Sequence, residues 1–324
     1  MPEAIKQFVD TLHESKRNAA YSKYRELQQE YKSAIENELQ RDKNSMNFVD
    51  LAIYPFGLSG KLAQSKYRFY CADPLFYLAY QIKDTTSFDI LLYNEEDAST
   101  IFIECKSGLN ISNTILDDIN KKISTVNKYF KTEFDVESSN TEFVLMTTFE
   151  TAEKLPPLSN DIIIWAADYW KGLIKIKIGT HKNVVLNSLL SQGIAAPEFN
   201  KIINIMPSSH FGNILSIVTS FLDLSMVKRE TERFTIVDIN EILFKEFRNY
   251  PETGIKKISE GILSCGIECG VFSKFGDNEY GIAIGTKNGG AARNASRRYI
   301  DYFGDKKALS RLKEIFSAQN RTLV

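Results

Sequence analysis

The sequence predicts an α/β protein in which a mixed sheet flanked by helices precedes a mainly helical C-terminal domain. Short apolar, strand-like runs recur between residues 88 and 168, with helical patterns before and between them. Beyond about residue 184 the apolar spacing becomes largely helical. A chain of 324 residues suggests two domains, which we place at residues 1–184 and 185–324.

The N-terminal part is predicted to hold two helices, over residues 3–16 and 21–42. The second has apolar side chains at intervals of three and four, which puts them on one face. They are Tyr24, Leu27, Tyr31, Ala34, Ile35 and Leu39. Segment 46–86 is mixed and aromatic, and we assign no element to it.

A β-hairpin is predicted next, with strands over 88–93 and 100–106 joined by the acidic turn "NEEDAS". An amphipathic helix follows, for which Ser112 or Asn113 could be the cap. The continuous apolar runs 142–148 and 161–168 are typical of strands buried on both faces, and a helical piece over 149–154 separates them.

The C-terminal part reads as three helices, over 210–230, 235–248 and 253–267, followed by a hairpin within 270–285. This order is that of a winged helix-turn-helix, although other helix-rich domains share it. The tail, 289–316, is predicted to form two helices broken at Gly304.

Composition is that of a soluble globular protein, with 43% hydrophobic and 25% charged residues and a net charge of −1. No apolar run approaches the roughly 18 residues of a membrane span, and the N-terminus lacks a signal-peptide pattern. We therefore expect a cytoplasmic protein without a membrane partner. Cys265 and Cys269 are close in sequence, but the histidines lie far away, so packed free cysteines are favoured over structural zinc.

Three charged residues stand at the ends of the predicted hairpin strands. Asp89 opens the first strand, and Glu104 and Lys106 close the second. Side chains alternate along a strand, so Glu104 and Lys106 point to one face. Asp89 can lie across from them on the antiparallel neighbour. These positions predict one cluster, whereas the plain alternative is a Glu–Lys pair at a solvated strand end.

Such a cluster suits cleavage of a phosphodiester. Asp89 and Glu104, with the backbone carbonyl of Cys105, could hold Mg²⁺, for which Mn²⁺ can substitute. The metal would lower the pKa of a bound water and neutralise charge on phosphorus. Lys106 could orient the water or stabilise the transition state.

The pattern of Asp89 followed by Glu104-Cys105-Lys106 resembles the PD-(D/E)XK nuclease superfamily, over roughly residues 21–170. The resemblance implies a restriction-endonuclease-like fold, with Asp89 and Glu104 as metal ligands and Lys106 as the catalytic lysine. Phe88 stands where the family name has proline. Many members add a glutamate from a preceding helix; Glu38 is preferred over Glu36 because it lies nearer the apolar stripe.

Basic residues of the C-terminal part are candidates for docking DNA. Residues 287–313 carry eight basic side chains against two acidic ones. The alternative is a solvated surface balanced by Glu252, Glu260 and Glu268. The candidates are Lys256, Lys257, Lys274, Lys287, Arg293, Arg297 and Arg298.

Together these expectations describe a Mg²⁺-dependent DNA endonuclease, foremost a type II restriction enzyme that cuts double-stranded DNA as a homodimer. A repair, resolvase or transposition nuclease is the nearest alternative. A DNA-binding regulator on the same scaffold without cleavage, or an enzyme acting on RNA, also stays open.

Overall fold

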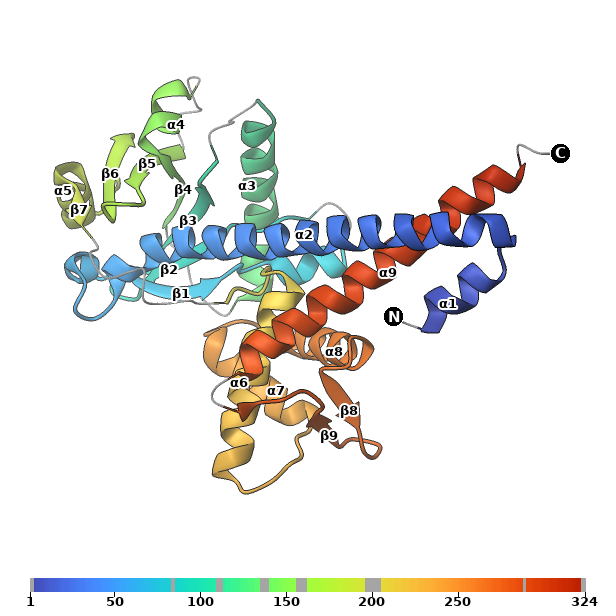
Figure 1. Ribbon diagram of the computed structural model, residues 1–324. Helices are drawn as coiled ribbons and strands as arrows, with labels where there is room; N and C mark the ends of the chain where they lie inside the picture. Colours follow the sequence, from blue (N-terminus) through green and yellow to red (C-terminus); the bar gives the residue numbers. More distant parts are fainter. Residues whose placement is uncertain are drawn as a thin grey trace. The chain divides into compact units, whose positions relative to one another are not determined.

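The computed structural model describes residues 3–82, 85–108, 113–134, 140–155, 162–195, 205–287 and 290–321. The chain divides into two compact units (Figure 1). Unit 1 combines Met1–Asp42, His210–Ile239 and Glu260–Val324, and unit 2 combines Lys43–Ser209 and Asn240–Ser259. This division differs from the single boundary predicted after residue 184, because the N-terminal helices pack with C-terminal ones.

Unit 2 is built on one seven-stranded sheet whose strands lie in chain order. Pairing is antiparallel between neighbours from β1 to β3, parallel from β3 to β5, and antiparallel from β5 to β7. The predicted mixed sheet is thus confirmed. The strands are β1 (Arg68–Ala72), β2 (Ile90–Asn94), β3 (Ser99–Lys106), β4 (Asn140–Thr148), β5 (Ile162–Asp168), β6 (Leu173–Ile178) and β7 (Ile194–Ala195).

Helix α3 (Asn113–Glu133) connects the parallel strands β3 and β4 and packs on the sheet. Its Ile119 is buried against Leu145 of β4 and Ile164 of β5. The short helix α4 (Phe149–Lys154) begins at Thr148, whose hydroxyl accepts the N–H of Thr151 at 3.2 Å. Helix α5 (Val184–Gln192) is capped in the same way by Asn183.

The predicted hairpin, central helix and two apolar strands are confirmed as β2, β3, α3, β4 and β5. The sequence analysis missed β1, β6, α5 and β7. Segment 46–86 proves to contain the end of α2 (Glu14–Ile53), three 3₁₀ turns and β1. β1 is an edge strand with a register shift between Phe69 and Cys71, so its residues do not show the simple alternation that marks a strand.

Unit 1 is helical. Helix α1 (Glu3–Asp10), the first part of α2 and the last part of α9 (Ala291–Arg321) share one apolar core. α6 (Phe211–Lys228) packs against α9. A small hairpin of β8 (Phe272–Lys274) and β9 (Tyr280–Ile282) completes the unit. The core residues are Ile5, Val9, Leu12, Ala20, Tyr24, Leu27, Ala308, Leu312 and Phe316.

The predicted order of three helices and a hairpin is confirmed. α6, α7 (Ile236–Glu246) and α8 (Glu252–Glu268) precede the hairpin. Phe234, between α6 and α7, forms a bridge with Tyr280 of β9. The parts of α7 and α8 nearest the turn between them belong to unit 2, so these helices are shared by the two units.

Two helix predictions near the termini are wrong. The first helix ends at Asp10, and a new helix starts at Glu14 and continues to Ile53. In the tail, α9 runs unbroken through Gly304. A Cβ at Gly304 would lie 2.5 Å from Cγ of Lys32 on α2, so this glycine permits a close helix approach and is no helix end.

Among the described residues, α6 alone is long and apolar enough to cross a membrane. Its apolar side chains Ile214, Leu215, Val218 and Leu222 are buried in the protein. Core helices of soluble proteins share this length and composition.

Candidate functional site

Three acidic residues lie at one end of the neighbouring strands β1, β2 and β3: Asp73 directly follows β1, Asp89 directly precedes β2, and Glu104 lies in β3. Ile90 of β2 pairs with Ile103 of β3, so Asp89 stands opposite Glu104. The backbone N–H of Asp89 donates to Ile103 O at 3.1 Å, and Asp73 N–H donates to Asp89 O at 2.9 Å. The pairing therefore brings Asp73, Asp89 and Glu104 into one row across three strands.

Glu104 faces the sheet surface that α3 covers. Its parallel partner in β4 is Leu145, which packs against α3. The side chain of Glu104 is fully buried. Its two oxygens meet two lysines: Lys106 Nζ lies 2.5 Å from Oε1, and Lys122 Nζ of α3 lies 2.6 Å from Oε2. Glu104 and Lys106 are thus brought together as predicted, and Lys122 is added.

Hydrogen-bond geometry distinguishes the two lysines. Lys122 donates a hydrogen bond to Oε2, whereas the close contact of Lys106 lacks the alignment of one and leaves Oε1 without an aligned donor. Lys122 is buried and Lys106 is half-buried. Lys122 is therefore the buried counter-charge of Glu104, and Lys106 is the more exposed one.

Burial and neighbouring charges raise the pKa values of Asp73 and Asp89. Burial and then the charge of Glu104 raise the pKa of Asp89 well above its ordinary value, although Lys122 and the Cys105 N–H oppose the shift. That N–H donates to Asp89 Oδ2 at 2.7 Å. Burial raises the pKa of Asp73 to about 7, against hydrogen bonds from Ser208. Such buried, crowded carboxylates favour added positive charge.

The charge of Lys106 is stabilised in the same cluster. Burial disfavours its charged form, but attraction to Glu104 and Asp89 outweighs that effect and raises the pKa of Lys106. The ammonium therefore stays charged beside the carboxylates. On strand β3, the side chain of Lys106 is more exposed than that of Glu104, so a bound anion could reach Lys106.

Sequence reasoning missed Asp73 and Lys122, although each left a signal. Asp73 directly follows β1, at a position with a positive φ of 46° that aspartate tolerates better than most residues. Lys122 lies three residues after Ile119 and four before Val126, on the apolar face of α3. A lysine on such a face predicts a buried acidic partner.

The donors at this site suit a hard cation. Asp73, Asp89 and Glu104 offer carboxylate oxygens, and Oε1 of Glu104 is buried without an aligned donor. Mg²⁺ takes one or two such carboxylates and keeps several waters. Within the part of the chain that the structure describes, however, no group of three His, Cys, Asp or Glu residues has metal-site spacing. The carbonyl of Cys105 stays a predicted ligand.

Glu38 lies in unit 1, where its carboxylate is 4.0 Å from Nε2 of His210. The cluster described above belongs to unit 2. The catalytic role predicted for Glu38 therefore stays a prediction.

The predicted DNA-docking residues fall in both units: Lys256 and Lys257 in unit 2, the other five in unit 1. Arg293 and Arg297 are exposed on one face of α9. Lys256 pairs with Glu252 at 2.8 Å, as the solvated-surface alternative expects. Arg298 donates from Nε to Cys269 O at 2.9 Å, at the end of α8. Lys274 and Lys287 are exposed.

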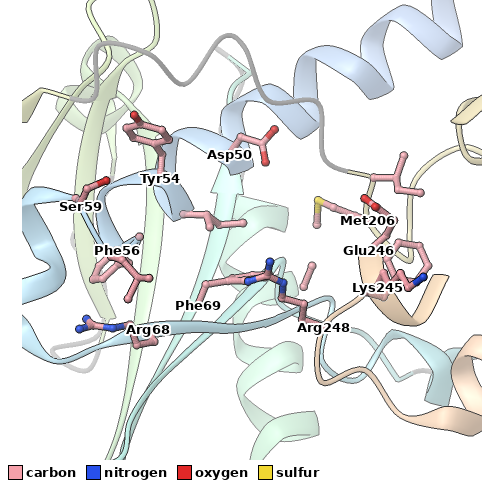
Figure 2. Close-up of a pocket in the computed structure, with 17 residues that line it drawn as sticks. Asp50, Tyr54, Phe56, Ser59, Arg68, Phe69, Met206, Lys245, Glu246 and Arg248 are labelled. Atoms are coloured by element: carbon pink, nitrogen blue, oxygen red, sulfur yellow. The ribbon is translucent and has the colours of Figure 1, made fainter. Parts of the chain in front are cut away.

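Unit 2 also contains a cavity of about 720 Å³ between β1 and the C-terminal parts of α2 and α7 (Figure 2). Figure 2 shows Lys245 and Glu246 on one side and Asp50 on another. The residues that line this cavity include acidic, basic and aromatic side chains, so the lining does not indicate one class of ligand. Asp89, Glu104 and Lys106 are not among its lining residues.

Comparison with models of protein families, with curated proteins and with solved structures found no match for this chain.

Proposed function

We propose that this protein is a metal-dependent DNA endonuclease of the PD-(D/E)XK type, with its catalytic centre in unit 2. The observation that carries the proposal is the placement of Asp89 opposite Glu104, with Lys106 Nζ 2.5 Å from that glutamate. The surrounding order of hairpin, helix and parallel strands supports the same class.

Asp89 and Glu104 would hold Mg²⁺ or Mn²⁺. Asp73 is a third carboxylate in the same cluster, since it interacts electrostatically with Glu104, Asp89 and Lys122. When bound, the metal supplies a Lewis acid and lowers the pKa of a water. The chain's own part is to keep the acids together: Cys105 N–H holds Asp89, and Lys122 holds one oxygen of Glu104.

Lys106 is the residue that meets the substrate in this proposal. It is charged, half-buried and lies 2.5 Å from Glu104 Oε1. With a metal bound at Glu104, Lys106 would be the cation placed to face a phosphate oxygen or the attacking water. A positive charge fixed there stabilises the charge that develops on phosphorus.

Among such enzymes a type II restriction endonuclease acting on double-stranded DNA as a homodimer is the particular member we propose. Two strands need two active sites, and a two-fold dimer supplies them. Repair, resolvase and transposition nucleases share this chemistry. We expect it in the cytoplasm, where DNA is available.

One observation favours a second candidate, a DNA-binding protein without cleavage. Lys122 already neutralises Glu104 inside the protein at 2.6 Å. A permanent counter-ion of this kind could replace a metal. In that protein the three acids and two lysines would serve stability alone.

The test is cleavage of plasmid DNA with Mg²⁺ or Mn²⁺ by wild type, Asp89→Asn, Lys106→Met and the exposed control Lys154→Met. We expect metal-dependent cutting by wild type and control, with loss of at least about a hundredfold in the two site variants. DNA retention without cutting by folded wild type would favour the second candidate, and cutting of supplied RNA alone would change the substrate class.

A further inference from the structure

The loop between β5 and β6, residues Tyr169 to Gly172, presents a tryptophan to solvent. The chain contains two tryptophans. Trp165 on β5 is 0% exposed, whereas Trp170 in the loop is 89% exposed. An exposed indole leaves a large apolar surface in water, so its place on the fold suggests a ligand.

The loop is held in shape. Asp168 Oδ1 accepts the N–H groups of Trp170 at 3.1 Å and Lys171 at 3.2 Å. Gly172 has the positive φ, 59°, that closes the turn, and its N–H donates to Tyr169 O. The ring of Tyr169 meets that of Trp170 edge to face, with centroids 5.4 Å apart. The two rings are therefore an ordered pair on a tight turn.

The register places this loop at the same sheet edge as Lys106. Strands β3, β4 and β5 are parallel, so their C-terminal ends share one edge. Thr147 of β4 pairs with Lys106 on one side and with Ala166 on the other. The loop follows Asp168, two residues beyond that row. Two strand spacings separate Lys106 from Ala166 by on the order of 10 Å, and Trp170 follows Ala166 by four residues, beyond the end of the strand.

Lysines accompany the aromatic pair. Lys171 belongs to the loop, and Lys175 and Lys177 are exposed on β6. Lys171 pairs with Asp168 at 3.2 Å and Lys177 with Glu153 at 3.6 Å. Exposed pairs of this kind are weak, so these ammonium groups stay available to phosphate. Aromatic rings with lysines beside them are the combination that binds single-stranded nucleic acid.

We infer that Trp170, supported by Tyr169, stacks on an unpaired base of the nucleic acid held at the Glu104–Lys106 end of the sheet. The inference rests on the proposed nuclease function and narrows its substrate: it favours the repair, resolvase or transposition nucleases over a restriction enzyme that cuts fully paired DNA. A DNA with an unpaired nucleotide near the cleaved bond binds more tightly than a fully paired duplex, because a paired base offers no free face to the indole.

The test uses intrinsic tryptophan fluorescence, since Trp170 is the solvent-accessible indole. Because Trp170→Phe and Trp170→Ala lack this indole, Kd is measured for every protein by the fluorescence anisotropy of labelled DNA, and tryptophan emission is read in the proteins that keep Trp170. Wild type, Trp170→Phe, Trp170→Ala and the exposed apolar control Leu58→Ala are titrated with three DNAs in Ca²⁺ to prevent cutting. The DNAs are a single strand, a duplex with one unpaired nucleotide and a fully paired duplex. Cleavage of the same DNAs in Mg²⁺ is measured in parallel.

We expect the first two DNAs to quench wild-type emission. Trp170→Ala should raise the Kd for the single strand and for the duplex with an unpaired nucleotide about tenfold. The Kd for the fully paired duplex should change by less than about twofold. Trp170→Phe should keep most of the affinity, and Leu58→Ala all of it.

Unchanged affinity in Trp170→Ala, or emission that no DNA alters, would overturn the inference even if wild type cuts DNA. Emission that shifts with protein concentration alone would overturn it in favour of contact between copies of the chain. If Trp170 stacks on DNA but the protein never cuts it, the stacking role of Trp170 would be supported and the proposed nuclease function would be rejected.

Discussion

Lys122 Nζ lies 2.6 Å from Glu104 Oε2, and both side chains are buried between α3 and the sheet. This pair fixes the helix to the strand that carries the candidate site. A buried ion pair need not stabilise a protein more than an apolar pair would, but loss of one partner leaves a buried charge alone.

Removal of one partner should therefore cost more than removal of both. We expect Lys122→Met to lower the free energy of unfolding by about 3 kcal/mol, and Lys122→Met with Glu104→Gln by clearly less. Urea denaturation followed by tryptophan fluorescence reports on unit 2, which holds both tryptophans. The exposed pair Lys154 and Glu150 is the matched control, with a change below about 1 kcal/mol. Equal losses in single and double variants would contradict a direct pair.

Metal binding should stabilise unit 2 through the acids. A ligand that binds only the folded state raises stability by about 2.7 kcal/mol at a hundred times its Kd. We expect Mn²⁺ to raise the unfolding midpoint of wild type, and the gain to fall in Asp73→Asn and vanish in Asp89→Asn. Glu96→Gln, an exposed acid, should keep the gain. Equal stabilisation of all four proteins would place the metal elsewhere.

Gly304 should resist replacement, although alanine is the better helix former. The usual gain of Gly to Ala in a helix is about 1 kcal/mol. At Gly304 the new Cβ would lie 2.5 Å from Lys32 Cγ, so we expect Gly304→Ala to destabilise by about 1–3 kcal/mol. Ser310→Ala, exposed on the same helix, should be neutral or slightly stabilising. Circular dichroism during thermal unfolding measures both, and a more stable Gly304→Ala would deny the close packing.

Stability at acidic pH should depend on Glu142. Trp165 Nε1 donates to His181 Nε2 at 2.9 Å, so Nδ1 of His181 carries the proton that it donates to Glu142 at 2.6 Å. Burial opposes ionisation of Glu142, but the hydrogen bonds from His181 and Lys182 outweigh it and lower its pKa. The ionised form therefore stabilises the fold above the ordinary pKa of 4.5, and this contribution is lost as pH falls through the folded value.

Glu142→Gln should accordingly be about 1.5–3 kcal/mol less stable than wild type at pH 7, with a difference that shrinks below about pH 4.5. Chemical denaturation at a series of pH values gives both quantities. Glu153→Gln, at an exposed carboxylate, is the control. A difference that stays constant down to pH 3 would show that the charge of Glu142 is not responsible.

The basic face of α9 should divide into binding and structural residues. Arg293 and Arg297 are exposed, so Arg293→Ala with Arg297→Ala should weaken DNA binding for all sequences and reduce the salt slope by roughly two. Arg298 caps Cys269 O, so Arg298→Ala should mainly reduce stability. DNA binding measured at a series of salt concentrations, together with unfolding of each variant, separates these roles. If the double variant has the same salt dependence of binding as wild type, α9 does not contact DNA.

The sequence alone was sufficient for the elements whose signals are local. The hairpin of β2 and β3 follows from two short apolar strands around an acidic turn, and its antiparallel pairing puts Asp89 opposite Glu104. Helix α3 and strands β4 and β5 follow from periodicity over their own lengths. The residue types at the strand ends were likewise visible without coordinates.

Only the tertiary structure decided which distant residues join them. Asp73 enters the acid row because β1 pairs with β2, and Lys122 reaches Glu104 because α3 lies on that face of the sheet. α9 continues through Gly304 because Lys32 of α2, in a helix far earlier in the chain, packs there. The physical reason is common to all three: a short window of sequence fixes the period of side chains, whereas the partner of a buried charge or a glycine is chosen by packing between segments far apart in the chain.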